Sequence, residues 1–387
     1  MAKTITSITL IFCLLTVSLT LEARQVVTGQ ITDRYDGTPI PGAAVFIART
    51  TTGTQTDRYG NFSITAPIQG SFEIVVSHIG FEPAFHSIDT PQSSHRINFA
   101  LRERINLLEE VVVSPCIPHS RRDIDFFWRT ILGENPSNRG MQVLNPEVVQ
   151  FCLIANDILR AFADEPIEIV NHNMGYHISY ILIDFKHDYR NEITRVSGVP
   201  FFTELTPQNN RQNNRWERRR QEVYSVSLTR FIRALYQEQL YKNGFFLAKR
   251  EQMEQTIIAK LALSREDTVR LRIPIPEQRG VVTTVETFSI NHILHRDEKA
   301  GTRVNIEQSV LVAFLSRPVT YMMLRDPDRT FFSRHVRHPI IRLLPLDITI
   351  FADGSYLGML NIREYRNSVL GLRAMLPMEF GLSEGTP

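Results

Sequence analysis

Two histidines and an aspartate lie close together in the stretch NHILHRDE and have the residue types of a metal site. They are His292, His295 and Asp297. Imidazole and carboxylate groups are common Zn²⁺ ligands, and residues three apart share one face of a helix. The preceding residues alternate like a strand, however, and on a strand residues three apart point to opposite faces. We therefore predict a strand end and a turn here, with a metal site as the alternative.

A second histidine pair has the same spacing among basic residues. His335 and His338 lie in the stretch SRHVRHP. Neither pair carries the adjacent glutamate of H-E-x-x-H, in which the glutamate acts as the general base of a metallopeptidase. We expect no metal at this second pair.

The sequence has none of the common motifs for catalysis or cofactor binding. It has no G-x-S-x-G elbow, no G-x-x-x-x-G-K-(S/T) phosphate loop and no G-x-G-x-x-G dinucleotide motif. Glycosidases use two separated carboxylates, but the sequence does not single out one pair among candidates such as Asp123/Asp125 and Asp326/Asp328. We therefore predict no catalytic residue, no cofactor and no metal, and we favour a non-enzymatic protein.

The chain has one local basic cluster, in the polar run QNNRQNNRWERRRQE. It consists of Arg211, Arg215, Arg218, Arg219 and Arg220, with Trp216 between them. If the run is helical, the first four arginines share a face that can meet the phosphates of lipid or lipopolysaccharide. The run equally suits a solvated loop, which we favour, with Trp216 packed against a sheet or the arginines. The candidate anion or partner surface is therefore Arg211, Arg215, Arg218, Arg219 and Trp216.

Residues 25 to 114 have the pattern of a small β-sandwich, with turn signals at short intervals. Gly53 is expected to take a positive φ, and Gly42 and Gly60 to permit backbone shapes that a side chain forbids. Asp57 can accept hydrogen bonds from the backbone of the RYG turn, and Phe62 then enters the space between the sheets. About seven strands in this length match an immunoglobulin-like sandwich.

Three stretches of this region carry a family resemblance: GQITDRYDGTPIPGAAVFI, TQTDRYGNFSI and IVVSHIGFEP. They resemble the carboxypeptidase regulatory-like domain, a transthyretin-like β-sandwich, from Gln25 to about Leu101. The resemblance implies a structural or adhesive unit that carries no catalytic residues. We expect a folding and docking unit here.

The following stretch, INLLEEVVVSP, is similar to the segment that precedes the plug of TonB-dependent outer-membrane receptors. Too few amphipathic strands follow it to build a barrel, so we do not expect a transporter. Glu110 to Val113 is better explained as the last strand of the sandwich, or as a strand offered to a partner's sheet edge.

The N-terminus has the pattern of a secretory signal peptide. Lys3 precedes an apolar stretch from about Ile8 to Leu21, and cleavage is expected after Ala23. An uncleaved anchor helix is the alternative. Cleavage would leave two of the three cysteines, Cys116 and Cys152, which can pair in an oxidising compartment. We favour two free thiols.

The rest of the chain reads as an antiparallel α+β region. We predict a helix from Asp123 to Leu132, a strong strand in GYHISYILIDF, and a core helix from Leu228 to Lys242 capped at Ser225 or Ser227 and stopped at Asn243-Gly244. Stretches such as SLTRFIRALY and FADGSYLG make this region similar to that of exported carboxypeptidase-like regulatory domain-containing proteins of Gram-negative bacteria. That family brings no assigned reaction.

The predicted plan is a signal peptide (1–23), a β-sandwich (24–114), a linker with a short helix (115–140) and an α+β domain (141–387). The fold class is mainly β or α+β. With a net charge of +2, nucleic acid is not an expected partner. We favour an exported protein of the periplasm, outer membrane or cell surface, which docks through its sandwich and binds an envelope protein, glycan or peptide. The alternatives are a periplasmic hydrolase and an accessory partner of an outer-membrane TonB-dependent transporter, and lipid head groups are a further possible ligand.

Overall fold

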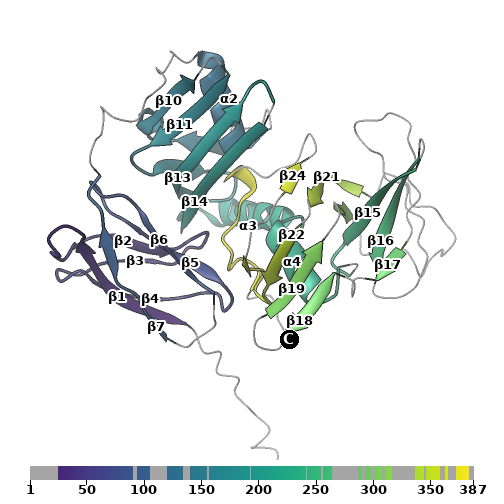
Figure 1. Ribbon diagram of the computed structural model, residues 1–387, viewed down its shortest axis with the longest axis horizontal. Coiled ribbons are helices and arrows are strands. Elements are labelled where there is room, and N and C mark those ends of the chain that lie inside the picture. Colours follow the sequence, from purple (N-terminus) through teal and green to yellow (C-terminus); the bar gives the residue numbers. More distant parts are fainter. Residues whose placement is uncertain are drawn as a thin grey trace, which may run out of the picture.

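The computed structural model describes most of the chain and shows a mainly β protein built from five sheets in the described ranges (Figure 1). These ranges are 25–89, 94–104, 120–133, 140–154, 157–191, 193–240, 242–253, 256–263, 287–289, 293–297, 301–306, 310–315, 336–343, 346–357, 362–364 and 372–382. The expected fold class is confirmed. The predicted signal peptide and the segment Glu110 to Val113 lie outside the described residues. No helix in the described ranges is both long and apolar enough to cross a membrane.

The N-terminal region is a sandwich of two four-stranded sheets, as predicted. The first sheet contains β1 (Val26–Asp33), β4 (Asn61–Thr65), β7 (Ser94–Arg96) and β8 (Phe99–Leu101). The second contains β3 (Gly53–Gln55), β2 (Ala44–Ile47), β5 (Phe72–Ser77) and β6 (Ala84–Ile88), in that order. β4 is antiparallel to β1, whereas β7 and β8 run parallel to it. The sandwich thus has eight strands, one more than expected.

The predicted turn chemistry of the sandwich is mostly present. The Asp57 Oδ1 atom accepts hydrogen bonds from the backbone nitrogens of Tyr59 and Asn61, both at 2.8 Å. Gly60 has φ +73°, and a Cβ there would lie 2.4 Å from a backbone oxygen. Phe62 is buried between the sheets. The prediction for Gly53 was wrong, because its φ is not positive. In the same turn the positive φ belongs to Arg49, at +62°.

The second part of the fold is a six-stranded antiparallel sheet. Its strands are β9 (Met141–Val143), β10 (Val149–Ile154), β11 (Ile158–Ala163), β12 (Ile167–Asn171), β13 (Tyr176–Asp188) and β14 (Ile193–Glu204), with the short helix η2 (Pro146–Val148) before β10. β13 pairs with β11 and β12 on one side and with β14 on the other. The predicted alternation along β13 is confirmed, since Tyr176, Ile178 and Tyr180 are buried in one core.

One face of this sheet is covered by helices. α2 (Arg121–Leu132) begins two residues earlier than predicted, with a capping box between Ser120 and Asp123, and it buries Phe127 and Ile131. α3 (Asn210–Tyr224) occupies the run for which we favoured a solvated loop, and that expectation was wrong. The helix is anchored by Trp216, which is 3% exposed. The boundaries proposed at residues 114 and 140 stay a prediction.

α4 (Leu228–Tyr236) is a core helix, as predicted, and Ser227 caps it by accepting from the Arg230 backbone nitrogen. Phe231 and Ile232 are buried in the core of the third part of the fold. The helix ends at Tyr236 and not at Lys242, because the chain turns at Glu238, which has φ +56°. Gly244 does have a positive φ, but it lies beyond the helix.

The third part holds two further sheets. One has the order β17 (Thr287–Ser289), β16 (Thr256–Leu263), β15 (Phe245–Met253), β20 (Val310–Leu315), β21 (Val336–Leu343) and β24 (Ile362–Glu364). The other has the order β18 (Leu294–Asp297), β19 (Gly301–Ile306), β22 (Leu346–Ile350) and β23 (Tyr356–Leu357). The last short helix is η5 (Leu372–Ala374).

The sandwich packs one outer face against the six-stranded sheet. Phe46 and Val75 of the sandwich share a buried cluster with Val199 of β14. The rings of Phe46 and Phe201 lie 4.9 Å apart between centroids. The β2–β3 turn also bonds to the edge of β14, where the Arg49 nitrogen donates to the Pro200 oxygen at 2.8 Å. The two parts are therefore joined by apolar packing and backbone hydrogen bonds together.

Candidate functional site

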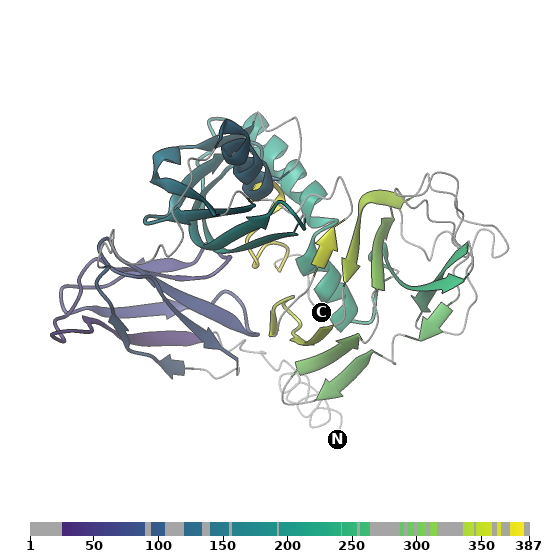
Figure 2. The ribbon, with the colours of Figure 1, turned by 45° about the horizontal axis from the view of Figure 1, so that its top comes forward.

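The three parts of the fold meet around residues 372–382, which we call the strap (Figure 2). The strap begins with η5 and bonds to the sandwich: the Met378 nitrogen donates to the Arg49 oxygen at 2.8 Å. The Thr51 nitrogen donates to the Glu379 carboxylate at 2.6 Å. These contacts join residues that are far apart in the sequence, and they attach the strap to the sandwich. The strap therefore holds the sandwich against the helices.

Arg233 of α4 fixes the strap from the other side. Its side chain is 6% exposed. The guanidinium donates to the backbone oxygens of Met378 and Phe380, at 2.6 and 2.8 Å, and to the Tyr224 hydroxyl at 2.7 Å. Its Nε donates to the Asp353 oxygen at 2.8 Å. A planar guanidinium with five donors suits this role, because it can satisfy several carbonyl groups at once.

Asp353 joins the loop after β22 to the sandwich. Its Oδ2 atom accepts from the backbone nitrogens of Gln69 and Gly70, and its Oδ1 atom accepts from that of Ser355. The carboxylate is buried. It thus serves as a structural acceptor for a loop of another part of the fold.

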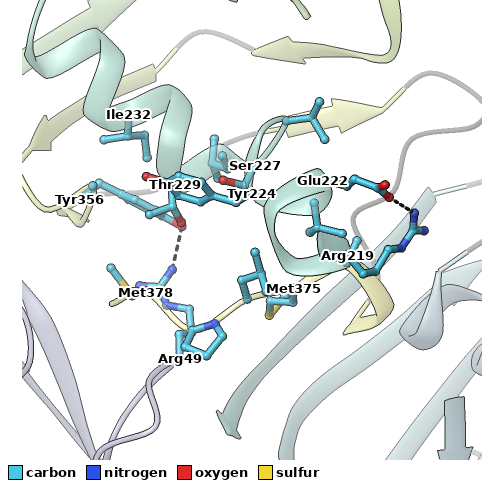
Figure 3. Close-up of a pocket in the computed structure, with 17 residues that line it drawn as sticks. Arg49, Arg219, Glu222, Tyr224, Ser227, Thr229, Ile232, Tyr356, Met375 and Met378 are labelled. Carbon is cyan, nitrogen blue, oxygen red and sulfur yellow. Dashed lines mark hydrogen bonds and ion pairs between the residues drawn. The ribbon is translucent and has the colours of Figure 1, made fainter. Parts of the chain in front are cut away.

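A pocket of about 330 Å³ opens at this junction (Figure 3). It lies between the end of α3, the start of α4, the β22–β23 loop and the strap, and Arg49 of the sandwich completes it. Most of its lining is apolar, with Val223, Ile232 and Met375 among the contributing side chains. Ligand sites commonly combine such an apolar lining with a few polar groups.

The charged groups of the pocket lie toward two ends of the view in Figure 3, with the hydroxyl side chains of Tyr224, Ser227 and Thr229 between them. At one end the Arg49 guanidinium donates to the Tyr356 hydroxyl at 3.2 Å and lies 5.3 Å from the centroid of that ring. Toward the other end Arg219 and Glu222 form an ion pair at 2.8 Å. The backbone of Arg49 is held in place by Pro200 and Met378, so its side chain is aimed from a fixed point.

A second, polar hollow of about 300 Å³ also borders the strap, at residues 377 and 379–381. It is lined by Glu204, Glu217 and Glu379 together with Arg220 and Tyr176. The Arg220 guanidinium donates to Glu204 at 3.2 Å and lies 4.1 Å from the centroid of the Tyr176 ring. Burial raises the pKa of the Tyr176 hydroxyl above its ordinary range, and the charge of Arg220 opposes that rise.

The structure separates the members of the predicted basic surface. Arg211, Arg215 and Arg218 are exposed on α3. Arg219 shares that exposed side but is paired with Glu222 and reaches the pocket. Trp216 faces inward, where its indole nitrogen donates to the His172 oxygen at 2.7 Å. It packs against the sheet, one of the two positions expected for it under the favoured interpretation, and does not belong to an exposed surface.

The predicted metal residues are only partly described. His295 lies in strand β18 and is exposed, which agrees with the strand expected there. His292 and His335 lie outside the described residues, as do the side chains of Asp297 and His338. In the described part of the chain, no group of three or more His, Cys, Asp or Glu side chains is arranged to hold a metal.

The carboxylate pairs considered for glycosidase chemistry were Asp123/Asp125 and Asp326/Asp328. Asp123 has a structural role. The Asp123 Oδ2 atom accepts from the Ser120 nitrogen and hydroxyl, both at 2.7 Å, and thereby caps α2. The Asp123 Oδ1 atom accepts from the Tyr189 hydroxyl, and this bond helps to raise the pKa of Tyr189, after burial, which is the larger cause. Asp326 and Asp328 lie outside the described residues.

Cys152 corrects another expectation. It forms a disulfide, so the prediction of two free thiols was wrong for this residue. The other two cysteines of the chain, Cys13 and Cys116, both lie outside the described residues.

The comparisons with known proteins concern the sandwich. Residues 27–113 match the family model described as the CarboxypepD_reg-like domain. The sandwich is a carboxypeptidase regulatory-like domain. The chain is 38% identical over 96 residues to the TonB-dependent receptor SusC of Bacteroides thetaiotaomicron, and 36% identical over 105 residues to the TonB-dependent receptor P39 of Formosa agariphila. The matches cover 25% and 27% of this chain, but only 9% and 10% of the two receptors.

Among solved structures, a membrane-associated protein of unknown function from Bacteroides fragilis matches 48% of this chain and 84% of its own. The identity is 12% and the TM-score is 0.17, which is too low to support an argument about fold or function.

The sequence alone did not reveal the residues that build the junction. Arg49, Arg233 and Asp353 belong to no motif and lie far apart in the chain. Two of them fall within the stretches SLTRFIRALY and FADGSYLG, on which the wider resemblance rested. An arginine on the apolar side of a core helix, as Arg233 is, was the available signal of a buried polar contact.

Proposed function

We propose that this chain is a non-enzymatic binding protein of the bacterial cell envelope. In this proposal the regulatory-like domain docks onto the rest of the chain and completes a ligand pocket at the junction. The observation that carries it is Arg49, which the regulatory-like domain supplies to a pocket otherwise built by α3, α4, the β22–β23 segment and the strap. A domain without catalytic residues then acquires a role as one wall of a binding site.

Two observations support an envelope location. The regulatory-like domain is similar to parts of two TonB-dependent receptors. Cys152 forms a disulfide, and stable disulfides are typical of oxidising compartments outside the cytosol. Both agree with the signal peptide that we predict from the sequence.

The chemistry of the pocket supports binding over hydrolysis. Its lining includes one carboxylate, Glu222, and that group is paired with Arg219. The lining includes no histidine, cysteine or aspartate, so its two hydroxyl side chains from α4 and its cap, Ser227 and Thr229, have no neighbouring histidine or aspartate in the lining to activate them as nucleophiles. The Ser227 hydroxyl instead caps α4 by accepting from the Arg230 backbone nitrogen.

Titration with the neutral apolar fluorophore N-phenyl-1-naphthylamine tests this proposal. We expect saturable binding to the full chain, and at least tenfold weaker binding to Met375→Trp, in which the larger side chain occupies the pocket. Ser63→Trp, at an exposed position on β4, is the matched control and should bind like the wild type. No saturable binding, or equal binding by all three proteins, would contradict the proposal.

The hydrolase alternative is favoured by a different feature, the three glutamates of the second hollow. Glu204 is held by Arg220 and Glu379 by Thr51, whereas Glu217 accepts, among the described residues, only a long hydrogen bond, at 3.5 Å, from the Gln221 side-chain nitrogen. Glu217 is therefore the side chain to test. Hydrolysis of peptidoglycan fragments that is lost in Glu217→Gln and retained in Met375→Trp would replace binding by catalysis as the function. Equal hydrolysis by the wild type and Glu217→Gln would assign it to a contaminant.

Association with an outer-membrane TonB-dependent transporter is the second alternative, and the similarity of the regulatory-like domain to such receptors favours it. Affinity capture from envelope extracts, with and without residues 106–114, tests this alternative. A transporter captured by the full chain and lost with the deletion supports it, and unchanged partners discard it.

A further inference from the structure

We infer that the junction pocket takes an apolar carboxylate of about a dozen non-hydrogen atoms, with its carboxylate at Arg49 and Tyr356. This inference rests on the proposed binding function and specifies the chemistry of the ligand. A medium-chain fatty acid and the C-terminal end of an apolar peptide share this chemistry. The pocket distinguishes such ligands from neutral and cationic ones by its size, its charge and the position of its donors.

The size of the ligand follows from the volume of the pocket. A volume of about 330 Å³ corresponds to roughly eleven water molecules in the liquid, at about 30 Å³ each. A ligand of about a dozen non-hydrogen atoms fills such a space, since covalently bonded atoms pack more closely than separate waters. The apolar side chains of α3, α4 and the strap would contact the body of the ligand.

The charge of the lining favours an anion. Arg49 and Arg219 contribute two positive charges and Glu222 one negative charge, so the net charge is +1. Arg219 is neutralised by its ion pair with Glu222. Among the ion pairs of the described residues none involves Arg49. Its guanidinium donates to the neutral Tyr356 hydroxyl, and its charge also acts on the carboxyl of the half-buried Glu73 of β5, which does not line the pocket. The remaining charge therefore sits at one end of the pocket.

Arg49 and Tyr356 together offer two neighbouring donors. The Tyr356 hydroxyl accepts from Arg49 at 3.2 Å and keeps its own proton available for another acceptor. The Arg49 guanidinium has further N–H groups beyond the one used in this bond. A carboxylate has two oxygen atoms, and charge-assisted hydrogen bonds from paired donors are the geometry that binds it well.

The backbone conformation of Arg49 supports a functional role for its side chain. Its φ of +62° lies in the region that glycine occupies without strain and that bulky residues rarely adopt. Strained residues are retained mainly where the surrounding structure and a site require them. A glycine would satisfy the turn, whereas an arginine also places a cation in the pocket. The Tyr356 contact alone is the competing explanation, and the experiment separates the two.

Isothermal titration with matched ligands tests the inference. Decanoate, 1-decanol and decyltrimethylammonium share an apolar chain and differ in the charge of the head group. N-acetyl-leucine and N-acetyl-leucinamide form a second pair, in which only the acid has a carboxylate. We expect the carboxylate of at least one pair to bind at least tenfold more tightly than its neutral analogue. Selectivity in the first pair alone identifies an acyl chain as the source, and selectivity in the second pair alone a peptide end.

Variants assign the selectivity to Arg49. Arg49→Gln should weaken carboxylate binding at least tenfold and leave decanol binding unchanged, and Arg49→Lys should restore part of the preference. Tyr356→Phe, which keeps the guanidinium, should lose only part of it. Arg34→Gln, at an exposed position of the same domain as Arg49, removes the same charge elsewhere and should have no effect. Thermal melting of each variant checks that the junction is intact.

The outcomes separate this inference from the proposed function. If decanol and decanoate bind equally well and Arg49→Gln weakens neither, the inference fails while a binding pocket remains. If Arg49→Gln weakens both ligands equally with an unchanged melting temperature, Arg49 shapes the pocket without recognising charge, and the inference also fails. If none of the ligands and no apolar fluorophore binds, the proposed function falls with it.

Discussion

The carboxylate of Asp353 binds the backbone amide of Gly70 across 283 residues of sequence, with 2.6 Å between Oδ2 and the nitrogen. The same oxygen accepts from the Gln69 nitrogen at 2.8 Å, so one side chain satisfies two consecutive amides of the β4–β5 loop. A Cβ at Gly70 would lie 2.2 Å from the Ser355 hydroxyl oxygen, and a side chain there would push the loop away. The regulatory-like domain is thus attached to the third part of the fold by a short-range, buried and charged contact.

Loss of the Asp353 carboxylate should weaken this attachment. Asp353→Ala leaves the amides of Gln69 and Gly70 without their acceptor, and an unsatisfied buried donor costs about 1–3 kcal/mol. We expect a lower midpoint of urea unfolding, with a smaller loss for Asp353→Asn, which keeps an acceptor oxygen. Asp36→Ala, in an exposed turn, is the control and should shift the midpoint less. Equal shifts for the two alanine variants would contradict this role of Asp353.

We expect position 53 to require glycine because of a close contact with a neighbouring side chain, and not because of its backbone conformation. A Cβ at this position would lie 2.8 Å from the end of the Phe201 ring on β14. Gly53→Ala should therefore lower the free energy of unfolding by about 1–3 kcal/mol, as overpacking does. The double variant Gly53→Ala/Phe201→Leu should recover part of that loss relative to Phe201→Leu alone. A double-mutant cycle of urea unfolding measures the coupling, and purely additive effects would contradict it.

Local chemistry made parts of the fold predictable from the sequence. The turn at Asp57, the alternation along β13 and the Ser227 cap depend on residues within a few positions of each other. α3 was missed because its buried stripe is narrow and includes a charged residue: Trp216, Arg220 and Val223. Its apolar content is too low to indicate a helix, and tertiary contacts hold it in place.

Sequence patterns could not predict the junction, for a different reason. The junction is held by hydrogen bonds to backbone atoms of distant segments, made by Arg49, Arg233 and Asp353. Backbone donors and acceptors are the same in almost every residue type, so the sequence does not mark them. The positive φ of Arg49 is likewise a property of the folded turn, where we had expected Gly53 to supply it. Long-range contacts of this kind become visible only in the structure.

Glu73 should make stability fall as the pH rises. It lies half-buried on β5, and burial raises the pKa of its carboxyl above the ordinary value, while the charge of Arg49 opposes that rise. The folded state therefore holds the proton to a higher pH than the unfolded state. The contribution of Glu73 to stability is fully present below the unfolded pKa, near about 4.3, and is lost as the pH rises through the folded pKa.

Glu73→Gln removes this pH dependence. We expect the variant to be more stable than the wild type at pH 7 and no more stable at pH 4, as measured by the midpoint of urea unfolding. The gain at pH 7 should be larger in an Arg49→Gln background, because the opposing positive charge is then absent. Glu82→Gln, at an exposed position next to β6, is the control and should change stability by less than about 0.5 kcal/mol. A gain from Glu73→Gln that is the same at both pH values would argue against burial as the cause.

Arg233 should control the order of the strap, and Arg230 on the same helix provides a matched comparison. Arg233→Met removes the donors to the Met378 and Phe380 oxygens, whereas Arg230 donates to the Ser225 oxygen and to Asn243. The backbone amides of Met378, Phe380 and Leu382 are hydrogen-bonded in the strap, so hydrogen exchange reports on its opening. We expect Arg233→Met to speed exchange at these amides at least tenfold, which corresponds to about 1.4 kcal/mol. Arg230→Met should leave their exchange unchanged, and equal acceleration by both variants would mean that α4 as a whole, and not Arg233, holds the strap.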